Sequence, residues 1–282
     1  MTKVNNWIRK FLTSPKTRAV ALMLLVGGTA AFAQTTAGDY TAGTNALTTV
    51  AEEIALRLGA DIEEIVAVDP YAEDFSATIE RCNRERSEGI LPEIAPVKAD
   101  LSQYDVIFLG FPVWYGICAR PVLTLLEGVD LAGKKVVPFC TFGSGGLQSS
   151  TRLIAEKQPG AEILPGYGVR AARIQAAPAE IDTFLKAGGF LEGEYEKLED
   201  FPESHPVSEA ESALFDAAVD GYPMIHAKAV SAASRTIPGG TEYLFTAVDE
   251  PRDDAPVADP GEMQVYVTAL EGEAPVFTQV VR

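Results

Sequence analysis

Two short loops carry the residue types that could bind a flat ring with a polar edge. The first, PVWYG at 112–116, follows the apolar run DVIFLGF and places Trp114 beside Tyr115. The second, TFGSGG at 141–146, follows the apolar run KKVVPFCTF, and its glycines let backbone N–H groups approach a ligand closely. Aromatic faces stack on a planar heterocycle while amides bind its edge. Together the loops predict a site for such a ring.

Both loops lie between an apolar strand and a helix, and this alternation continues along most of the chain. The runs expected to be strands are 62–68, 105–111, 134–142 and 161–169, and the runs with helical periodicity are 45–58, 75–87, 120–131, 147–157 and 177–189. Alternation with short connections predicts a parallel sheet with helices on both faces. In such sheets ligands bind beyond the carboxyl ends of the strands, where both loops would lie. Pro138 stands out inside its run because it cannot donate a ladder hydrogen bond.

The pattern changes after residue 191. Residues 192–206 are acidic and interrupted by prolines, which is typical of a linker. Residues 207–282 begin with one helix that carries a Ser208–Glu211 capping box. The strand-like runs that follow are 224–237, 241–248, 263–270 and 275–281, separated by turns such as PGG and EGE. The simplest packing is one helix on a four-stranded antiparallel sheet.

The first 33 residues differ from the rest of the chain. They contain basic side chains and no acidic ones, followed by the apolar stretch AVALMLLVGGTAAFA, which ends in the small-residue site Ala31-Phe32-Ala33. This pattern predicts a secretory signal peptide at 1–33, a mature chain that starts at Gln34, and a periplasmic or secreted protein. The alternatives are a membrane anchor and a buried strand. The stretch is shorter than the roughly 20 residues of a spanning helix, so we expect no stable membrane insertion after cleavage.

The composition excludes several classes of function. Forty acidic against 23 basic residues give a net charge of −17, which repels nucleic acid and favours basic partner proteins. The two histidines, His205 and His226, are too few to make a Ser-His-Asp or zinc site a good expectation. The odd number of cysteines leaves at least one thiol free, and we expect all three to be small packing residues.

The two loops and their spacing resemble the flavodoxin family, in particular its bacterial branch with a P-x-W-x-G loop. The likeness covers about residues 44–190, within an expected domain at 35–191, and includes TVAEEIALRLGADIEEI as first helix and second strand. It implies a doubly wound parallel sheet and an FMN cofactor whose ring lies between Trp114 and Tyr115. The residues expected along the flavin edge are Pro112, Val113, Gly116, Thr141, Phe142, Gly143, Ser144, Gly145 and Gly146. Gly116 is a candidate for a peptide that reorients toward the reduced flavin.

The phosphate loop departs from the family pattern. The family begins with an apolar strand and a Ser/Thr- and Gly-rich loop that holds the FMN phosphate at a helix N-terminus. Here Thr44, Asn45 and Thr48 could supply the polar groups, but the preceding segment QTTAGDY is polar. The first strand is therefore expected to be missing from the mature chain, or replaced by retained residues near 20–33. A loop without its strand predicts that FMN is held loosely.

Residues 207–282 resemble a cystatin-like domain, with a helix, the hairpin AVSAASRTIPGGTEYLFTAV and two further strands. The family's inhibitory hairpin reads Gln-x-Val-x-Gly, whereas residues 236–240 read Thr-Ile-Pro-Gly-Gly. Protease inhibition is therefore not expected.

Two hypotheses for function follow. The first is an exported flavodoxin-like protein that uses FMN for electron transfer or reductase chemistry with a basic redox partner. The alternative is a flavodoxin fold without cofactor that acts as a binding protein together with its cystatin-like module.

Overall fold

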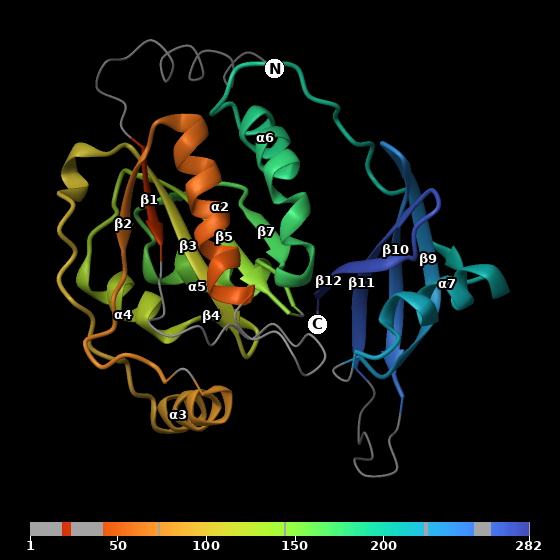
Figure 1. The fold of residues 1–282 in the computed structure, drawn as a ribbon, viewed down its shortest axis with the longest axis horizontal. Helices are drawn as coiled ribbons and strands as arrows, with labels where there is room; N and C mark the ends of the chain where they lie inside the picture. Colours follow the sequence, from red (N-terminus) through yellow and green to blue (C-terminus); the bar gives the residue numbers. More distant parts are fainter. Residues whose placement is uncertain are drawn as a thin grey trace. The chain divides into compact units, whose positions relative to one another are not determined.

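The computed structural model describes residues 19–23, 42–72, 74–143, 145–222, 225–250 and 261–281. Contacts along the chain divide it into two compact units, drawn in Figure 1. The N-terminal unit comprises residues up to 143 and 147–195, and the C-terminal unit comprises 144–146 and 196–282. The main boundary, between Tyr195 and Glu196, falls within the predicted linker.

A seven-stranded sheet forms the centre of the N-terminal unit. Its main path runs in the order β2-β1-β3-β5-β6, and all neighbours on this path are parallel. β4 pairs antiparallel with β3, and β7 pairs parallel with β5. The strands are β1 (Ala19–Met23), β2 (Asp61–Glu64), β3 (Val106–Trp114), β4 (Ile117–Cys118), β5 (Lys135–Phe142), β6 (Glu162–Ile163) and β7 (Tyr167–Arg170). The predicted parallel sheet is thus confirmed.

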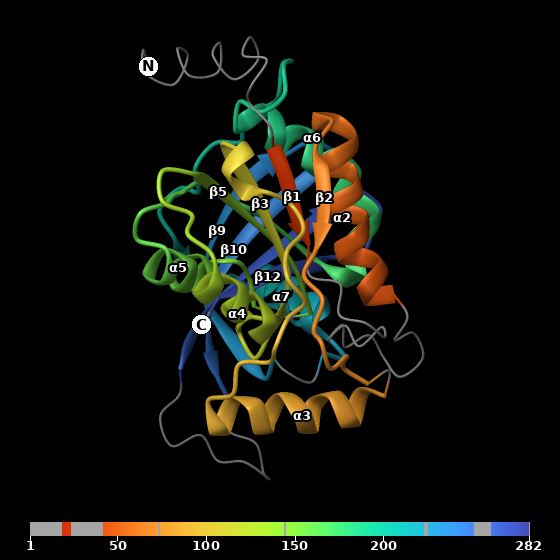
Figure 2. The same cartoon turned by 90° about the vertical axis from the view of Figure 1, so that its left-hand side faces the viewer.

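The sequence left two alternatives for the first strand, absence from the mature chain or replacement by retained residues near 20–33, and in the uncleaved chain a retained segment forms it. Ala19–Met23 forms β1 in the middle of the sheet, in register with β2 through Ala21 and Ile62 and with β3 through Ala21 and Phe108. Figure 2 shows β1 between its two neighbours. This strand lies within the predicted signal peptide, so cleavage after Ala33 would remove it. The cleavage site itself lies outside the described residues.

Helices cover both faces of this sheet, as the alternating pattern predicts. On one face, α2 (Ala42–Leu58) and α6 (Ala177–Ala187) pack on Val106, Phe108 and Phe139. On the other, α4 (Arg120–Gly128) and α5 (Gln148–Lys157) pack on the alternate residues of β3. Because β3 is buried on both faces, its sequence reads as a continuous apolar run.

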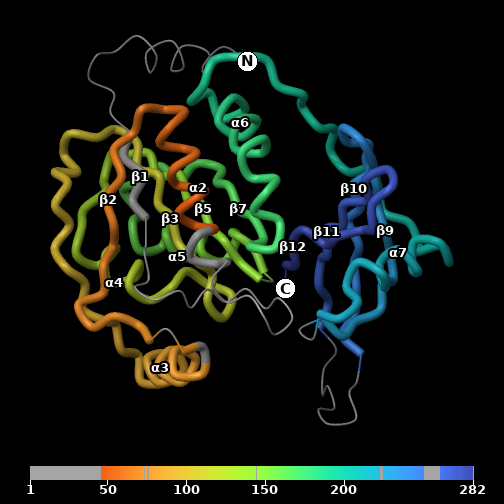
Figure 3. Tube along the Cα trace, in the orientation of Figure 1, coloured from red at the N-terminus to blue at the C-terminus, as the bar shows by residue number. Residues whose placement is uncertain are grey.

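Two predicted strands differ in detail from the observed ones. The run 161–169 forms two separate strands, β6 and β7, which pair with different parts of β5. Pro138 lies between those parts, since β6 pairs with Lys135 and Val136 and β7 begins pairing at Phe139. The missing N–H of Pro138 is tolerated because this edge of β5 has no strand partner in register there. The predicted strand 62–68 ends early at Glu64, and Figure 3 traces the irregular segment that continues to α3 (Phe75–Glu88).

The C-terminal unit is one helix on an antiparallel sheet, as predicted, with an added short strand. The helix α7 (Glu209–Val219) begins at the predicted capping box of Ser208 and Glu211. The sheet order is β12-β11-β10-β9-β8. Its strands are β8 (His205–Pro206), β9 (Ala227–Ile237), β10 (Gly240–Asp249), β11 (Glu262–Leu270) and β12 (Val276–Val281).

Part of the predicted linker 192–206 belongs to this C-terminal sheet. Arg235 donates a hydrogen bond to the carbonyl oxygen of Glu199 over 2.8 Å, and its guanidinium lies 4.3 Å from the ring centroid of Phe201. His205 and Pro206 form β8 against β9. The later residues of the predicted linker are therefore held by the C-terminal sheet.

Candidate functional site

Three segments of the N-terminal unit lie at one edge of its sheet. β1, β3 and β5 are parallel neighbours, so their carboxyl ends lie at the same edge. From this edge β3 continues into the turn at Tyr115 and β5 into the glycine-rich loop, and the start of α2 lies here too, since Ala46 packs against Ala171, which directly follows β7. The predicted phosphate-binding residues and the two predicted ring-binding loops thus start from one edge, the usual ligand edge of such a sheet.

The first predicted loop is the tip of a β-hairpin. β3 extends through Pro112, Val113 and Trp114, and the chain then turns back into β4, with Trp114 opposite Ile117. The two turn residues, Tyr115 and Gly116, have φ values of 50° and 83°. Two successive positive φ values are those of a type I′ turn, which matches the twist of the strands it joins. The expected strand-to-helix loop at 112–116 is therefore corrected to a strand end and a two-residue turn.

This geometry separates the two aromatic side chains. Trp114 is 4% exposed, and its ring meets the ring of Tyr71 edge-on, with 5.0 Å between centroids and 71° between planes. Tyr115 is 42% exposed, and the guanidinium of Arg86 lies 4.5 Å from its ring centroid. Tyr115 is therefore the aromatic side chain that this turn exposes. Stacking of Trp114 on a flavin stays a prediction, and it requires the indole to become more exposed than it is in this structure.

A small hollow lies beside the turn. It is lined by Tyr115, Trp114, Arg86 and Arg120 among others, and its volume is about 20 Å³. That is room for about one water molecule. Ligand sites for drug-sized molecules typically measure about 300–1,000 Å³, so this hollow is too small to contain a flavin ring.

The second predicted loop is anchored where β5 ends. Thr141 and Phe142 are the last residues of β5 and are buried. The Nε of Arg170, at the end of β7, donates a hydrogen bond to the carbonyl oxygen of Gly143 over 2.9 Å. Ser144 lies outside the described residues, and residues 145–146 group with the C-terminal unit. The structure therefore places Thr141, Phe142 and Gly143 at the sheet edge.

The predicted phosphate-binding residues lie at the start of α2. Thr44 and Asn45 are in its first turn, which has no acidic residue, and Thr48 follows one turn later. The first N–H groups of a helix have no partner within the helix and carry a partial positive charge, which suits an anion. Because β1 is present in the full-length chain, the reason for expecting a loose hold on the phosphate no longer applies.

The cysteines are free and buried, which confirms that they are packing residues. Burial raises the pKa of Cys82 and of Cys118 to about 12, and it raises the pKa of Cys140 further. All three stay protonated at neutral pH and are poor nucleophiles. Within the described ranges, no group of three or more His, Cys, Asp or Glu side chains could hold a metal ion. None of the helices described is both long and apolar enough to span a membrane.

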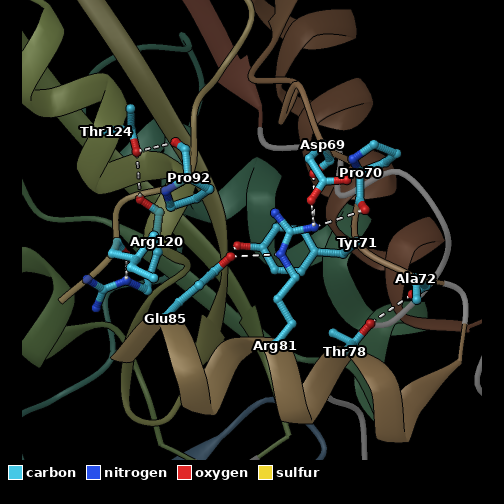
Figure 4. A network of polar contacts seen from close by, with 11 residues as sticks. Asp69, Pro70, Tyr71, Ala72, Thr78, Arg81, Glu85, Pro92, Arg120 and Thr124 are labelled. Carbon is cyan, nitrogen blue, oxygen red and sulfur yellow. Dashed lines mark hydrogen bonds and ion pairs between the residues drawn. The ribbon is translucent and has the colours of Figure 1, made fainter. Parts of the chain in front are cut away.

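One cluster near the turn was not predicted from the sequence. Helix α3 carries a buried carboxylate, Glu85, which accepts a hydrogen bond from the hydroxyl of Tyr71 and another from Nε of Arg81, each over 2.7 Å (Figure 4). The sequence showed only a mostly polar helix at 75–87. The available signal was the Arg81–Glu85 pair, four residues apart on one helix face.

Comparisons with known proteins agree with this fold. The model of the flavodoxin family matches residues 37–177, which is half of the chain. A candidate flavoprotein from Bacteroides eggerthii is 24% identical, with a TM-score of 0.44, over 59% of this chain and 98% of its own. A candidate flavoprotein from Bacteroides uniformis is 22% identical, with a TM-score of 0.47, over the same shares.

A third solved structure is that of a flavoprotein from Lactobacillus acidophilus in complex with FMN. It is 20% identical, with a TM-score of 0.42, over 59% of this chain and 97% of its own. The comparison with curated proteins gives no match. The family match covers β3, β5, the turn at Tyr115 and the start of α2, and this chain belongs to the flavodoxin family.

Proposed function

We propose that this protein binds FMN at the carboxyl edge of its N-terminal sheet and uses it for electron transfer or reductase chemistry. The observation that carries the proposal is the common edge of three features in a member of the flavodoxin family. These features are the exposed ring of Tyr115 on a tight turn, the anchored end of β5 at Gly143, and the N-terminus of α2. Together they offer a ring face, backbone groups for a ring edge, and an anion site.

Each part has a distinct role in binding. Tyr115 stacks on the flavin ring, and the backbone of 112–116 and 141–143 binds the ring edge. Thr44, Asn45 and Thr48 bind the phosphate together with the first N–H groups of α2. Gly116, with its φ of 83°, allows the peptide beside it to change orientation, since glycine adopts positive φ without steric cost. FMN supplies the redox step, while these residues supply binding and orientation.

Export belongs to the same proposal. Residues 1–33 have the basic and apolar character of a secretory signal, which favours a periplasmic or secreted protein. Cleavage after Ala33 and folding of the N-terminal sheet compete for the same residues, because β1 lies in this segment. We therefore take the uncleaved chain to be the form that binds FMN.

The burial of Trp114 favours a second candidate function. An indole that is 4% exposed contributes little to a binding surface as it stands. The alternative is a flavodoxin fold without cofactor that acts as a binding protein, with the C-terminal unit as a cystatin-like interaction module. The net charge of −17 favours basic partner proteins in either case.

Replacing Tyr115 with glycine is expected to weaken FMN binding while leaving the fold intact. Loss of one stacked aromatic ring costs about 1–3 kcal/mol of binding free energy. Glycine adopts the φ of 50° more easily than tyrosine, which offsets the lost Arg86 contact, so the free energy of unfolding changes by about 1 kcal/mol or less. Titration of flavin fluorescence and a thermal melt measure the two effects. An unchanged affinity for FMN would show that Tyr115 does not stack on the ring.

A further inference from the structure

Helix α3 contacts Tyr115 directly and reaches its neighbour Trp114 through Tyr71. Arg86 of α3 lies over the ring of Tyr115. Glu85 of α3 accepts the hydrogen bond of Tyr71, whose ring meets Trp114 edge-on. The sheet alone therefore does not hold the two rings. A separate helix beyond the end of β2 contributes to the position of each.

The carboxylate of Glu85 is the centre of this arrangement. It is 3% exposed, and each of its oxygens accepts a hydrogen bond: Oε2 from the Tyr71 hydroxyl and Oε1 from Arg81 Nε, both over 2.7 Å. A buried carboxylate is tolerated only when its oxygens are satisfied in this way. The two donors are thus required partners, which fixes the side chain of Glu85 and the hydroxyl of Tyr71 together.

Arg81 holds the same tyrosine from a second side (Figure 4). Its guanidinium lies 4.0 Å from the ring centroid of Tyr71. The same group donates to the carbonyl oxygens of Asp69 and Pro70, each over 3.0 Å, and lies 3.2 Å from the Asp69 carboxylate. Tyr71 is therefore held at its hydroxyl, at one ring face and through the backbone that precedes it.

The hydroxyl of Tyr71 is the donor in its bond to Glu85. Burial raises its pKa, and the hydrogen bond and negative charge of Glu85 raise it further, well above the ordinary value. Tyr71 therefore keeps its proton at neutral pH and is the donor in its bond to Glu85.

We propose that Glu85 and Arg81 are positioning residues of the flavin site, acting through Tyr71 on Trp114 and so on the turn at Tyr115. The proposal rests on the proposed binding of FMN. Trp114 is the last residue of β3, and Tyr115 follows it directly in the turn. The edge of the Tyr71 ring limits rotation of the Trp114 indole. Because Tyr115 is bonded directly to Trp114, this contact also sets the orientation of the turn toward the cofactor.

The test removes the hydroxyl of Tyr71 and measures the fluorescence of Trp114. The chain has two tryptophans, Trp7 and Trp114, so Trp7→Phe makes Trp114 the only one. In that background, Tyr71→Phe keeps the ring edge but deletes the bond to Glu85. We expect the emission of Trp114 in flavin-free protein to shift to longer wavelength and to be quenched more by acrylamide. We expect the Kd for FMN to rise about tenfold.

Thr124→Val is the matched control. The Thr124 hydroxyl donates to the carbonyl oxygen of Pro92 over 2.7 Å, the same length as the Tyr71–Glu85 bond, and lies outside the cluster that holds Tyr71 (Figure 4). Because both variants lose one hydrogen bond of the same length, Thr124→Val is expected to lower the melting temperature about as much as Tyr71→Phe does. It is expected to leave both the Trp114 emission and the Kd for FMN unchanged. A purely structural role for Tyr71 would give two variants that behave alike.

Three outcomes would overturn the proposal. The first is a Tyr71→Phe variant whose emission and Kd match those of Thr124→Val. The second is a shifted emission with an unchanged Kd, which would mean that the cluster holds Trp114 but does not serve the site. The third is absence of FMN binding in the unsubstituted chain. That result is seen before any variant is made, and it also refutes the proposed function.

Discussion

A chain that begins at Gln34 is expected to bind no FMN and to lose the cooperative unfolding transition of its N-terminal unit. Such a chain lacks β1, the strand that lies between β2 and β3. β3 would keep β5 but lose its partner on the other side along residues 106–110, and β2 would lose its only neighbour on the main path of the sheet. The sheet would be divided at its centre, beside the edge at which we place the flavin.

The size of this effect follows from the hydrogen bonds that are lost. Each intramolecular hydrogen bond contributes about 0.5–1.5 kcal/mol net, and an unsatisfied buried group costs more. A five-residue strand paired on both sides makes several such bonds. Their loss is comparable with the roughly 5–15 kcal/mol that stabilises a whole domain. We therefore expect loss of the folded unit and not merely a weaker one.

The matched control is a chain that begins at Ser14, which lacks much of the basic segment but keeps β1. Both chains are checked by intact mass and compared by calorimetric melting and FMN titration. The control is expected to behave like the full-length protein. If the Gln34 chain melts and binds FMN as the control does, β1 is dispensable, and residues 1–33 serve only as a removable signal.

Gly110→Ala is expected to destabilise the N-terminal unit strongly. Gly110 lies in the middle of β3, in register with Phe139 of β5. A Cβ at this position would lie 2.2–2.9 Å from three ring atoms of Phe139, a fully buried side chain. The ring would have to move within a close-packed core, and overpacking of this kind typically costs about 1–3 kcal/mol.

Gly128→Ala provides the control for this second prediction. Gly128 is the last residue of α4, and nothing lies within 4 Å of the position that its Cβ would take. Alanine is expected there to leave the melting temperature unchanged or to raise it slightly, because glycine is the poorer helix former. Urea denaturation of both variants measures the difference. Equal stabilities would mean that the Phe139 ring can make room for a Cβ at position 110 without cost.

Sequence patterns predicted the elements that carry long periodic runs. The apolar run of β3 and the helical spacing of α2 and α6 each extend over many residues, so packing on the sheet leaves a clear period. The flavodoxin-like order of strands followed from the resemblance of the two loops, and the family match confirms the family. The antiparallel strands of the C-terminal unit were also predicted, because their lengths and the turns between them are regular.

β1 could not be assigned from composition alone. A central parallel strand and the apolar segment of a signal peptide are both short continuous apolar runs, and nothing local distinguishes them. Pairing with both Asp61–Glu64 and Val106–Gly110 identifies the strand, and such long-range pairing is not visible in the run itself. The family match begins at residue 37 and therefore does not include it.

The turn and its supporting helix were missed for local reasons. β4 has only two residues, Ile117 and Cys118, too few to show a period of two. Tyr115-Gly116 also lacks the Asn-Gly signature of a type I′ turn, although glycine is at its second position. Since β3 extends through Trp114, the indole is buried and the next side chain is exposed. Glu85 was not expected in the core because charged side chains are rarely buried.

Equilibrium titration of the full-length, uncleaved chain with FMN tests the central claim most directly. Intact mass first confirms that residues 19–23 are present, and flavin fluorescence and visible absorption then report binding. We predict saturable binding of one FMN per chain. Fluorescence and absorption that stay those of free FMN up to about 1 mM, a limit on binding of roughly −4 kcal/mol, would contradict the account and favour the cofactor-free binding protein.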